Sequence, residues 1–557
     1  MARDRDALRT SGERTAAAGA GRSMRGMRPL TFSWNDGVVI AAVVLACGLA
    51  AFIGMPVLRQ FEHDVFFSLD NAYRISQGQI PHRDFASAFG PLFFLIEAAG
   101  LTISGMRPAG IGYANALFGA LIAIWTYLAV RTRLAPVPAG ALGVYAVLLI
   151  TAPFSLGYNP LAFSYAMGYN RYGYALLGII LVECGVQALR TDAHERQGSG
   201  RAFSIGVAWA LLAFLKISYA MVAVPFLIVW LWCGADRGRR SVALCGGFGV
   251  VAAILLCYLR FDFTDMFRDL AEAASARRLT WQPRSILSPA VVIESIPLLL
   301  LAAVLTAGTG EAPWRRVRLW LFVLLTVGVG GFLLSTNHQS MSLPLGGFAA
   351  VVLVDAAIAR RDSGGGADRP RRLLALFLAA LCFLPLAMMN AVSLAAASWE
   401  RYRGPEAAAV RLNSERGASM IFGPVESSMT SETGGPAYVE VLNDGLELIR
   451  TRAEPGVGVM TIDVLNPFNY LLSRPSPRGG MATAVYHLTF SDAAHPSAER
   501  FFGDARYVLV RKYSQAVQDF PIEDYLIQGL LRTYQPALEQ RFRLVEETGH
   551  WSLWRRK

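Results

Sequence analysis

Charged side chains are scarce in this sequence, and lysine is almost missing. Only 17% of the 557 residues are charged, against roughly 25% in typical soluble chains, while 54% are hydrophobic. Of the 52 basic residues, three are lysines, namely Lys216, Lys512 and Lys557. So few charges cannot cover the surface of several soluble domains. The composition therefore excludes a soluble multidomain protein, a disordered chain and a fibrous one.

Cysteine and histidine are too few and too scattered to suggest a disulfide framework or a metal motif. All six cysteines lie in apolar runs, and the seven histidines show no metal-ligand spacing with them. The net charge of +11 comes from arginines in short connectors between apolar runs. Because these arginines are spread over many connectors and not gathered in one basic domain, we predict no nucleic-acid partner.

Long apolar runs dominate the rest of the chain. A membrane span needs roughly 20 apolar residues, or fewer where protein surrounds it. The runs fall at about 37–57, 111–130, 138–154, 171–189, 203–215, 219–234, 241–259, 289–308, 319–335, 344–359 and 373–396. We treat 203–234 as two spans because it is too long for one crossing and Pro225 interrupts it; one long helix is the alternative. These runs predict an α-helical polytopic membrane protein with about 11 transmembrane helices.

Connectors rich in arginine alternate along the chain with connectors that are poor in it. This alternation predicts the orientation of the chain in the membrane. They gather in the connectors that face inside if the N-terminus is inside, and the loops near 155–170 and 336–343 contain none. Loop 260–288 is the exception, which suggests that it has a task. The predicted domains are a basic cytoplasmic tail at 1–36, a transmembrane domain at 37–396 that includes a first outside loop at 58–110, and an outside domain at 397–557. Gly364–Gly366 reads as a flexible connector.

The C-terminal region is too polar to cross a bilayer and has the pattern of a small α/β domain. Its predicted elements are a helix at 437–453, strands at Val457–Ile462 and Tyr507–Val510, a helix at 522–546, and a closing hairpin formed by 542–547 and 551–554. This domain shows no catalytic constellation. We expect it to cover the site or to bind an acceptor.

The first outside loop carries the candidate chemistry. Apolar residues form one stripe from Val65 to Gln77, which predicts an amphipathic helix on the membrane surface that ends at Gly78. Asp64 is its N-cap and shares a polar face with Asn71. Asp70 has Arg74 four positions on, which predicts a surface ion pair.

Asp64 has two interpretations. As a helix cap it would contribute about 1 kcal/mol to stability. As a general base it would accept a proton at the membrane surface, although a helix N-terminus lowers the pKa of a carboxylate and weakens it as a base. Helix geometry alone favours the cap.

The order of elements carries a resemblance to a known family. A first span is followed by Asp64, then by Gly78-x-x-Pro81-x-x-Asp84-Phe85 and Pro91-Leu92, then by many spans and a C-terminal outside domain. This order resembles the GT-C membrane glycosyltransferases, above all the bacterial branch that includes lipid A aminoarabinose transferases and protein O-mannosyltransferases. The resemblance implies a polyprenyl-phosphate sugar donor, a bacterial cytoplasmic membrane and Asp64 as the catalytic base. Val65 stands where the family often has a second acid, and Gly90-Pro91 replaces its His-x-Pro-Pro element.

Cations near such a site would hold the leaving phosphate. The candidates are Lys216, which stands between apolar runs as a lysine does in the family, and Arg277, Arg278 and Arg284 in loop 260–288. Lys216 could instead snorkel at a helix end, and the arginines could contact lipid headgroups. His338 occupies a position where related enzymes often have a histidine, although an ordinary polar loop residue is favoured there.

Asn71 and Asp84 complete the candidate substrate-binding residues. Asp64 with Asp70 or Asp84 could also bind a divalent cation, although no metal or cofactor is required by the pattern. Five tyrosines from Tyr158 to Tyr174 predict an interfacial aromatic belt.

The resulting hypothesis is an inverting glycosyltransferase at the outer face of the membrane. A lipid-phosphate leaving group departs without protonation, so a single carboxylate can suffice. The acceptor hydroxyl could belong to a glycolipid, a polysaccharide or a protein. A transporter or flippase of lipid-linked sugar is the main alternative, and a non-enzymatic membrane assembly partner is another. Transporters favour internal repeats and paired intramembrane charges, which the sequence does not show.

Overall fold

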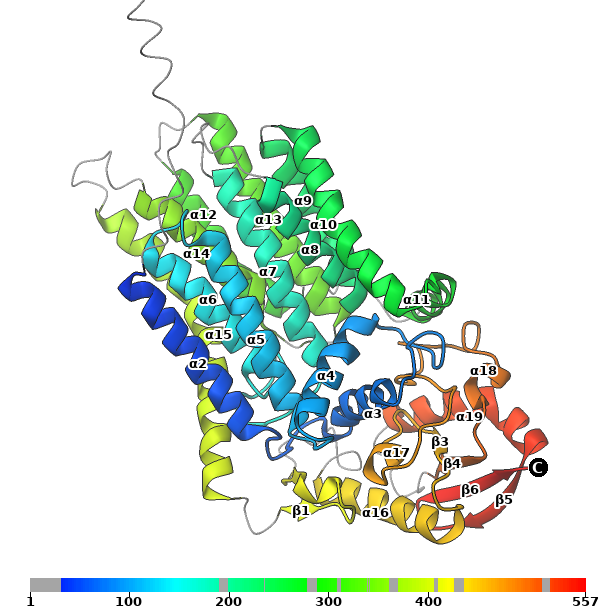
Figure 1. The fold of residues 1–557 in the computed structure, drawn as a ribbon. Coiled ribbons are helices and arrows are strands. Elements are labelled where there is room, and N and C mark those ends of the chain that lie inside the picture. The colour runs from blue at the N-terminus through cyan, green and yellow to red at the C-terminus, as the bar shows by residue number, and fades with distance from the viewer. Residues whose placement is uncertain are drawn as a thin grey trace, which may run out of the picture.

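The structure is a computed structural model of the chain. It describes residues 32–189, 199–234, 236–277, 288–307, 312–337, 339, 341–359, 369–404, 409–424, 435–512 and 521–557, without the side chains of 521–526. A bundle of long helices forms one part, and a mixed α/β domain lies beyond one end of the bundle (Figure 1).

Each of the eleven apolar runs forms a helix. These helices are α2 (Trp34–Ile53), α5 (Gly110–Val130), α6 (Pro136–Thr151), α7 (Gly168–Leu189), α8 (Ser199–Leu215), α9 (Ile217–Cys233), α10 (Arg237–Tyr258), α12 (Pro289–Thr306), α13 (Pro313–Thr336), α14 (Pro344–Ala359) and α15 (Arg369–Arg403). Seven of the described helices are long and apolar enough to cross a membrane. The predicted fold class, a helical multi-pass membrane protein with a C-terminal α/β region, is confirmed.

Segment 203–234 forms two helices, α8 and α9. The break between them is at Lys216, which has extended backbone angles (φ −160°, ψ 115°). Pro225 lies inside α9 and does not mark the break, so of the two reasons for the division only the length of the segment holds. At the break, the amino group of Lys216 reaches Asn170 and Asn337, which provide the polar contacts that an apolar helix pair lacks.

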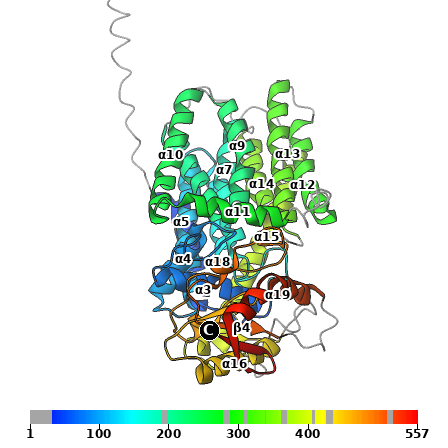
Figure 2. The same cartoon turned by 90° about the vertical axis from the view of Figure 1, so that its right-hand side faces the viewer.

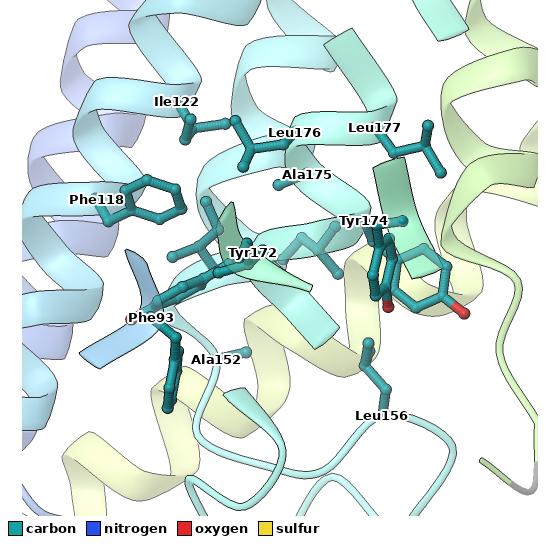
Figure 3. Close-up of a cluster of buried hydrophobic side chains, with 14 of the residues drawn as sticks. Phe93, Phe118, Ile122, Ala152, Leu156, Tyr172, Tyr174, Ala175, Leu176 and Leu177 are labelled. Carbon is teal, nitrogen blue, oxygen red and sulfur yellow. The ribbon is translucent and has the colours of Figure 1, made fainter. Parts of the chain in front are cut away.

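Helix α7 lies at the centre of the bundle. Its side chains are buried along almost its whole length, and Figure 3 shows Tyr172, Tyr174 and Leu176 packed among residues of α4, α5 and the loop after α6. Close packing depends on small residues in α7. A Cβ atom added at Gly178 would lie 2.6 Å from the ring of Phe348 on α14, so no larger side chain fits there.

The first loop contains more helix than the sequence predicts. After the short helix η1 (Glu62–Asp64) come α3 (Val65–Ser76) and a further apolar helix, α4 (Pro91–Ile103). Helix α3 has the predicted bounds, and Gly78 follows it with φ +83°. Its polar face is not exposed to solvent as the sequence predicts, because every side chain from Val65 to Arg74 is buried, and its position relative to a membrane stays a prediction.

The C-terminal domain explains this burial, because it packs directly on α3. Arg74 donates to the carbonyl oxygens of Pro477 (2.6 Å) and Gly479 (2.8 Å), and Asn71 donates to that of Ala482 (3.0 Å). Ala86 also exchanges backbone hydrogen bonds with this segment. Segment 474–482 thus covers the face of α3 that the sequence assigns to solvent.

The C-terminal domain contains the predicted elements. Its four-stranded sheet has the order β3 (Val459–Ile462), β4 (Tyr507–Arg511), β6 (Trp551–Arg556) and β5 (Phe542–Glu547), with β3 and β4 parallel and the other pairs antiparallel. Four helices pack around it, α16 (Gly435–Arg452), α17 (Phe468–Leu471), α18 (Ala498–Phe502) and α19 (Pro521–Arg541), and a two-stranded sheet of β1 (Val410–Arg411) and β2 (Ile421–Phe422) flanks α16. The predicted helix at 522–546 ends at Arg541, and 542–546 belong to the hairpin, which is confirmed.

The predicted surface ion pair between Asp70 and Arg74 is wrong. Both side chains are buried, Arg74 donates its hydrogen bonds to Gln79 and to backbone carbonyls, and Asp70 Oδ1 has no hydrogen-bond partner among the described residues. Burial raises the pKa of Asp70 to about 7, and the positive charge of the nearby Arg74 offsets part of this rise.

The raised pKa of Asp70 predicts that the stability of the protein depends on pH. Because the folded protein binds a proton at Asp70 up to about pH 7 and the unfolded chain releases it near pH 4, the free energy of unfolding should fall as pH rises between these values. Asp70→Asn should remove this slope and raise the melting temperature at neutral pH. Thermal unfolding of both proteins in detergent from pH 4 to 8 tests this, and parallel curves would contradict it.

Candidate functional site

A buried lysine marks the end of the bundle nearest the first loop. Lys216 is 5% exposed, and its ammonium group donates to Asn170 Oδ1 (3.1 Å) and Asn337 Oδ1 (2.6 Å). Among the described residues no carboxylate lies within 4.0 Å of it. Amide oxygens of two asparagines hold the amino group and no described carboxylate competes for it, so a bound anion would be the group that favours its protonated form.

The two asparagines are themselves held in place. Asn337 Nδ2 donates to the hydroxyl of Tyr219 (2.9 Å), and that hydroxyl lies 3.3 Å from the carbonyl oxygen of Asn170. Asn170 is at the start of α7, and Asn337 directly follows α13. Three helices and the α8–α9 break therefore orient the oxygens around Lys216. This role of Asn170 and Asn337 was missed in the sequence, where nothing near them in the chain points to Lys216.

Aromatic rings form the wall beside the ammonium group. Lys216 Nζ lies 4.7 Å from the ring centroid of Tyr169 and 5.7 Å from that of Phe89, and these two rings are 4.5 Å apart. Cation–π attraction partly replaces the water that the ammonium group has lost. Phe93 packs against Tyr169 from the other side (5.7 Å).

The predicted interfacial belt of tyrosines is wrong for most of its members. Tyr165, Tyr172 and Tyr174 are at most 6% exposed and lie inside the bundle. Tyr169 is half-buried and is the one that contacts Lys216. Sequence periodicity could not separate these rings, because they all fall in or beside one apolar helix.

Tyr169 also connects Lys216 to the other candidate charges. Its hydroxyl interacts electrostatically with the carboxyl group of Asp64 and with the guanidinium group of Arg277. Arg277 in turn interacts with Lys216. Arg277 is the last residue of α11 (Phe263–Arg277), the helix within the unusually basic loop. Tyr169 therefore interacts with two basic residues, Lys216 and Arg277, and with the carboxyl group of Asp64, which come from three distant parts of the chain.

Asp64 lies at the junction of η1 and α3, as the N-cap of α3. Its carboxyl group accepts no capping hydrogen bond from the helix, so the cap interpretation loses its energetic basis. The side chain is 29% exposed, and Oδ1 lies 3.4 Å from His63 Nε2. Burial raises the pKa of Asp64, and His63 lowers it in part. Burial therefore outweighs the lowering of the Asp64 pKa that a helix N-terminus would cause. A carboxylate with a raised pKa is a stronger base than an ordinary aspartate.

The C-terminal domain contributes polar groups near Asp64. Tyr438 on α16 interacts electrostatically with both Glu62 and Asp64. Glu62 is fully buried with neither carboxyl oxygen hydrogen-bonded among the described residues, and burial raises its pKa. The boundary between the C-terminal domain and the first loop therefore lies beside Asp64, the candidate base.

Other predicted site residues lie elsewhere. Asn71 and Asp84 are at the interface with the C-terminal domain, where Asp84 accepts from the backbone N–H of Ile80 (2.8 Å) and lies 3.6 Å from Arg478. These partners give both residues a structural role, and their substrate contacts stay predictions. Arg278, Arg284 and His338 lie outside the described residues. Within the described ranges, no three His, Cys, Asp or Glu side chains come close enough to hold a metal ion.

Comparisons with known proteins give similarity at the level of the fold. No family model matches the chain, and no curated protein matches it. The crystal structure of ArnT from Cupriavidus metallidurans in the apo state is similar over 94% of this chain and 98% of that one, with 12% identity and a TM-score of 0.41. The same protein bound to undecaprenyl phosphate gives a TM-score of 0.39, with 12% identity over 93% and 98% of the two chains.

A third solved structure is also similar to this chain. It is an Archaeoglobus fulgidus oligosaccharyltransferase tethered to an acceptor peptide, with 11% identity over 93% of this chain and 74% of that one and a TM-score of 0.38. ArnT and the oligosaccharyltransferase are both GT-C membrane glycosyltransferases, the superfamily that the first loop resembles. The roles assigned to single residues rest on the geometry around Lys216 and Asp64.

This geometry predicts that a simple anion stabilises the protein through Lys216. At ten times its Kd, inorganic phosphate would add about 1.4 kcal/mol to the free energy of unfolding. We expect phosphate to raise the melting temperature of the wild-type protein in detergent, compared with sodium chloride of equal ionic strength. Lys216→Met should lose this increase. Lys512→Met, which removes a lysine in the C-terminal domain, should keep it, and equal loss in both variants would contradict the prediction.

Proposed function

We propose that the chain is an inverting glycosyltransferase. It would move a sugar from a polyprenyl-phosphate donor to a hydroxyl acceptor at the outer face of a bacterial cytoplasmic membrane. The observation that carries the proposal is the buried Lys216, held by amide oxygens and without a carboxylate partner in the described structure, close to the same tyrosine as Asp64.

The donor would place its phosphate between the two cations. Lys216 and Arg277 would neutralise the negative charge that develops on the phosphate as the bond to the sugar breaks. Such a site favours phosphate over a neutral group, since each charge-assisted hydrogen bond is worth about 1.5–3 kcal/mol. The isoprenoid tail would lie along the apolar surface of the bundle, where lipid surrounds the helices.

Asp64 would act as the general base. Its carboxylate would accept the proton of the acceptor hydroxyl while the hydroxyl oxygen attacks the anomeric carbon of the sugar. The phosphate leaves from the opposite side of that carbon as an anion, which requires no proton. Attack opposite the leaving group inverts the anomeric configuration, so one carboxylate completes the reaction.

The orientation follows from the arginine distribution and would put this end of the bundle outside the cytoplasm. Nucleotide sugars do not occur there, so a sugar used at this face must arrive on a lipid. The C-terminal domain, through Tyr438 and its neighbours, would bind the acceptor next to Asp64. A glycolipid, a polysaccharide and a protein hydroxyl fit this chemistry equally.

The intramembrane acids favour an enzyme over a transporter. Glu183 forms an ion pair with Arg133, Asp355 accepts from the backbone N–H of Ala135, and Glu294 accepts from the backbone N–H groups of Ser342 and Leu343. Each acid therefore stabilises a helix end or connection. No described acid pairs with Lys216 in the way expected of a proton-coupled pathway.

Removing the base tests the function. We expect Asp64→Asn to lower the rate of sugar transfer by about 10²–10⁴-fold without lowering the melting temperature, because the amide keeps the shape of the side chain but cannot accept the proton. Transfer is measured by mass spectrometry of glycolipids and glycans from membranes with and without the protein. Glu539→Gln, on the exposed face of α19, is the matched control. Unchanged transfer, or lipid flipping without transfer, would move the assignment to a transporter.

The raised pKa of Asp64 predicts the pH dependence of the reaction. Because the base must be ionised, kcat/KM should fall as pH falls through the pKa of Asp64, which lies above the value of about 3.9 for ordinary aspartate. The same decline should persist in Asp70→Asn and in Glu62→Gln, which remove two other carboxyl groups of the loop whose pKa is raised by burial. A rate independent of pH from 4 to 7 would contradict the assignment of Asp64.

A further inference from the structure

Helix α11 has two unlike faces and lies across the end of the bundle. Figure 2 shows it between the spanning helices and the C-terminal domain. Phe263 and Phe267 are 49% and 61% exposed on one face, and Met266, Asp269 and Ala273 are buried on the other. An amphipathic helix with exposed aromatic rings at this level has the character of an interfacial helix in the lipid headgroup region.

Asp269 connects the buried face of α11 to two other parts of the chain. Its Oδ2 lies 3.1 Å from His82 Nδ1 and accepts from the backbone N–H of Ser87 (3.0 Å), both in the first loop. Its Oδ1 accepts from Arg500 of α18, and Arg500 also donates to the carbonyl oxygen of His82. The Asp269 side chain is 1% exposed, so these partners replace its water completely.

The anchor at Asp269 fixes the position of Arg277. The two residues are eight positions apart on one helix, about 12 Å along its axis, and a helix of this length is rigid. Arg277 at the end of the helix interacts with Lys216, and two cations repel each other when no anion lies between them. The contacts that hold α11 to the first loop and to α18 oppose this repulsion and keep the end of α11 near Lys216.

We infer that Asp269 is a positioning residue, which holds Arg277 at the donor phosphate through α11 by its ion pair with Arg500 and its hydrogen bonds to the first loop. The inference rests on the proposed function, because it assumes that an anionic donor lies between Arg277 and Lys216. It also gives α18 of the C-terminal domain a part in donor binding.

A double-mutant cycle tests the inference. Undecaprenyl phosphate is the probe, and its Kd is measured with the full-length protein in lipid nanodiscs. Arg277→Ala should weaken binding by about tenfold or more, through loss of a charge-assisted hydrogen bond. Asp269→Asn should weaken it to a similar extent. The double variant should bind no more weakly than Arg277→Ala alone, since Asp269 acts only through Arg277.

Two further variants separate positioning from folding. Arg500→Lys keeps a cation beside Asp269, so its Kd should stay within about threefold of the wild-type value. Arg500→Gln removes that cation and should weaken binding as much as Asp269→Asn does. Asp265→Asn removes a half-buried carboxylate of the same helix that pairs with Arg268 (2.6 Å), and this matched control should leave Kd unchanged. If Asp269→Asn does not fold, the cycle of Arg500→Gln with Arg277→Ala provides the same comparison.

The possible outcomes distinguish this inference from the proposed function. Additive losses in the double variant, or a normal Kd in Asp269→Asn, would overturn the positioning role and leave the proposed function in place. A wild-type protein that does not bind undecaprenyl phosphate would overturn both. Loss of binding that is non-additive with Arg277→Ala supports the positioning role.

Discussion

Lys216 places an amino group in a part of the molecule that water does not reach, and the surrounding residues provide polar and aromatic contacts for it. An unpaired charge in an apolar environment costs several kcal/mol. Here two amide oxygens and a tyrosine ring reduce that cost, whereas a carboxylate would have cancelled the charge. The helix break at Lys216 and the ends of α7 and α13 bring these contacts together, and the hydroxyl group of Tyr219 in turn bonds to both asparagines. A phosphate group would complete this arrangement.

The C-terminal domain is part of the same site. It covers α3 through Arg74 and Asn71, reaches Asp64 through Tyr438, and holds α11 through Arg500. These contacts join the candidate base and the candidate phosphate cation to one body. In a bundle whose helices pack against lipid, a rigid domain of this kind can keep catalytic groups in register while the membrane around them moves.

Much of the fold could be predicted from hydropathy alone. The apolar runs locate the spanning helices to within a few residues, and alternation in the C-terminal region locates the strands, because both patterns are local. Asp64, Lys216 and Arg277 could be chosen as candidates because a charge beside an apolar run is conspicuous. Asn170 and Asn337 could not, since a neutral polar residue at a helix end has many ordinary uses.

The errors have a common physical cause. The sequence predicts α3 as a surface helix and Asp70–Arg74 as a surface ion pair, because its polar stripe looks solvated. That stripe is in fact covered by segment 474–482, and no local pattern reveals a partner so far away in the chain. The tyrosines of the predicted belt were misplaced for the same reason, since a ring at a membrane boundary and a ring in a polar bundle interior have the same sequence environment.

Arg74 of α3 donates to carbonyl groups 403 and 405 residues later in the chain. At roughly 5–20 residues per second, ribosomes would need tens of seconds to complete that interval. During this time Arg74 and Asn71 lack their carbonyl partners in segment 474–482, and only their local partners, Gln79 and the carbonyl oxygen of Phe67, are available. Biogenesis therefore passes through a stage in which the helices of the bundle have been synthesised but the first loop is still uncovered, and a chaperone or protease that reaches the loop would encounter the protein at that stage.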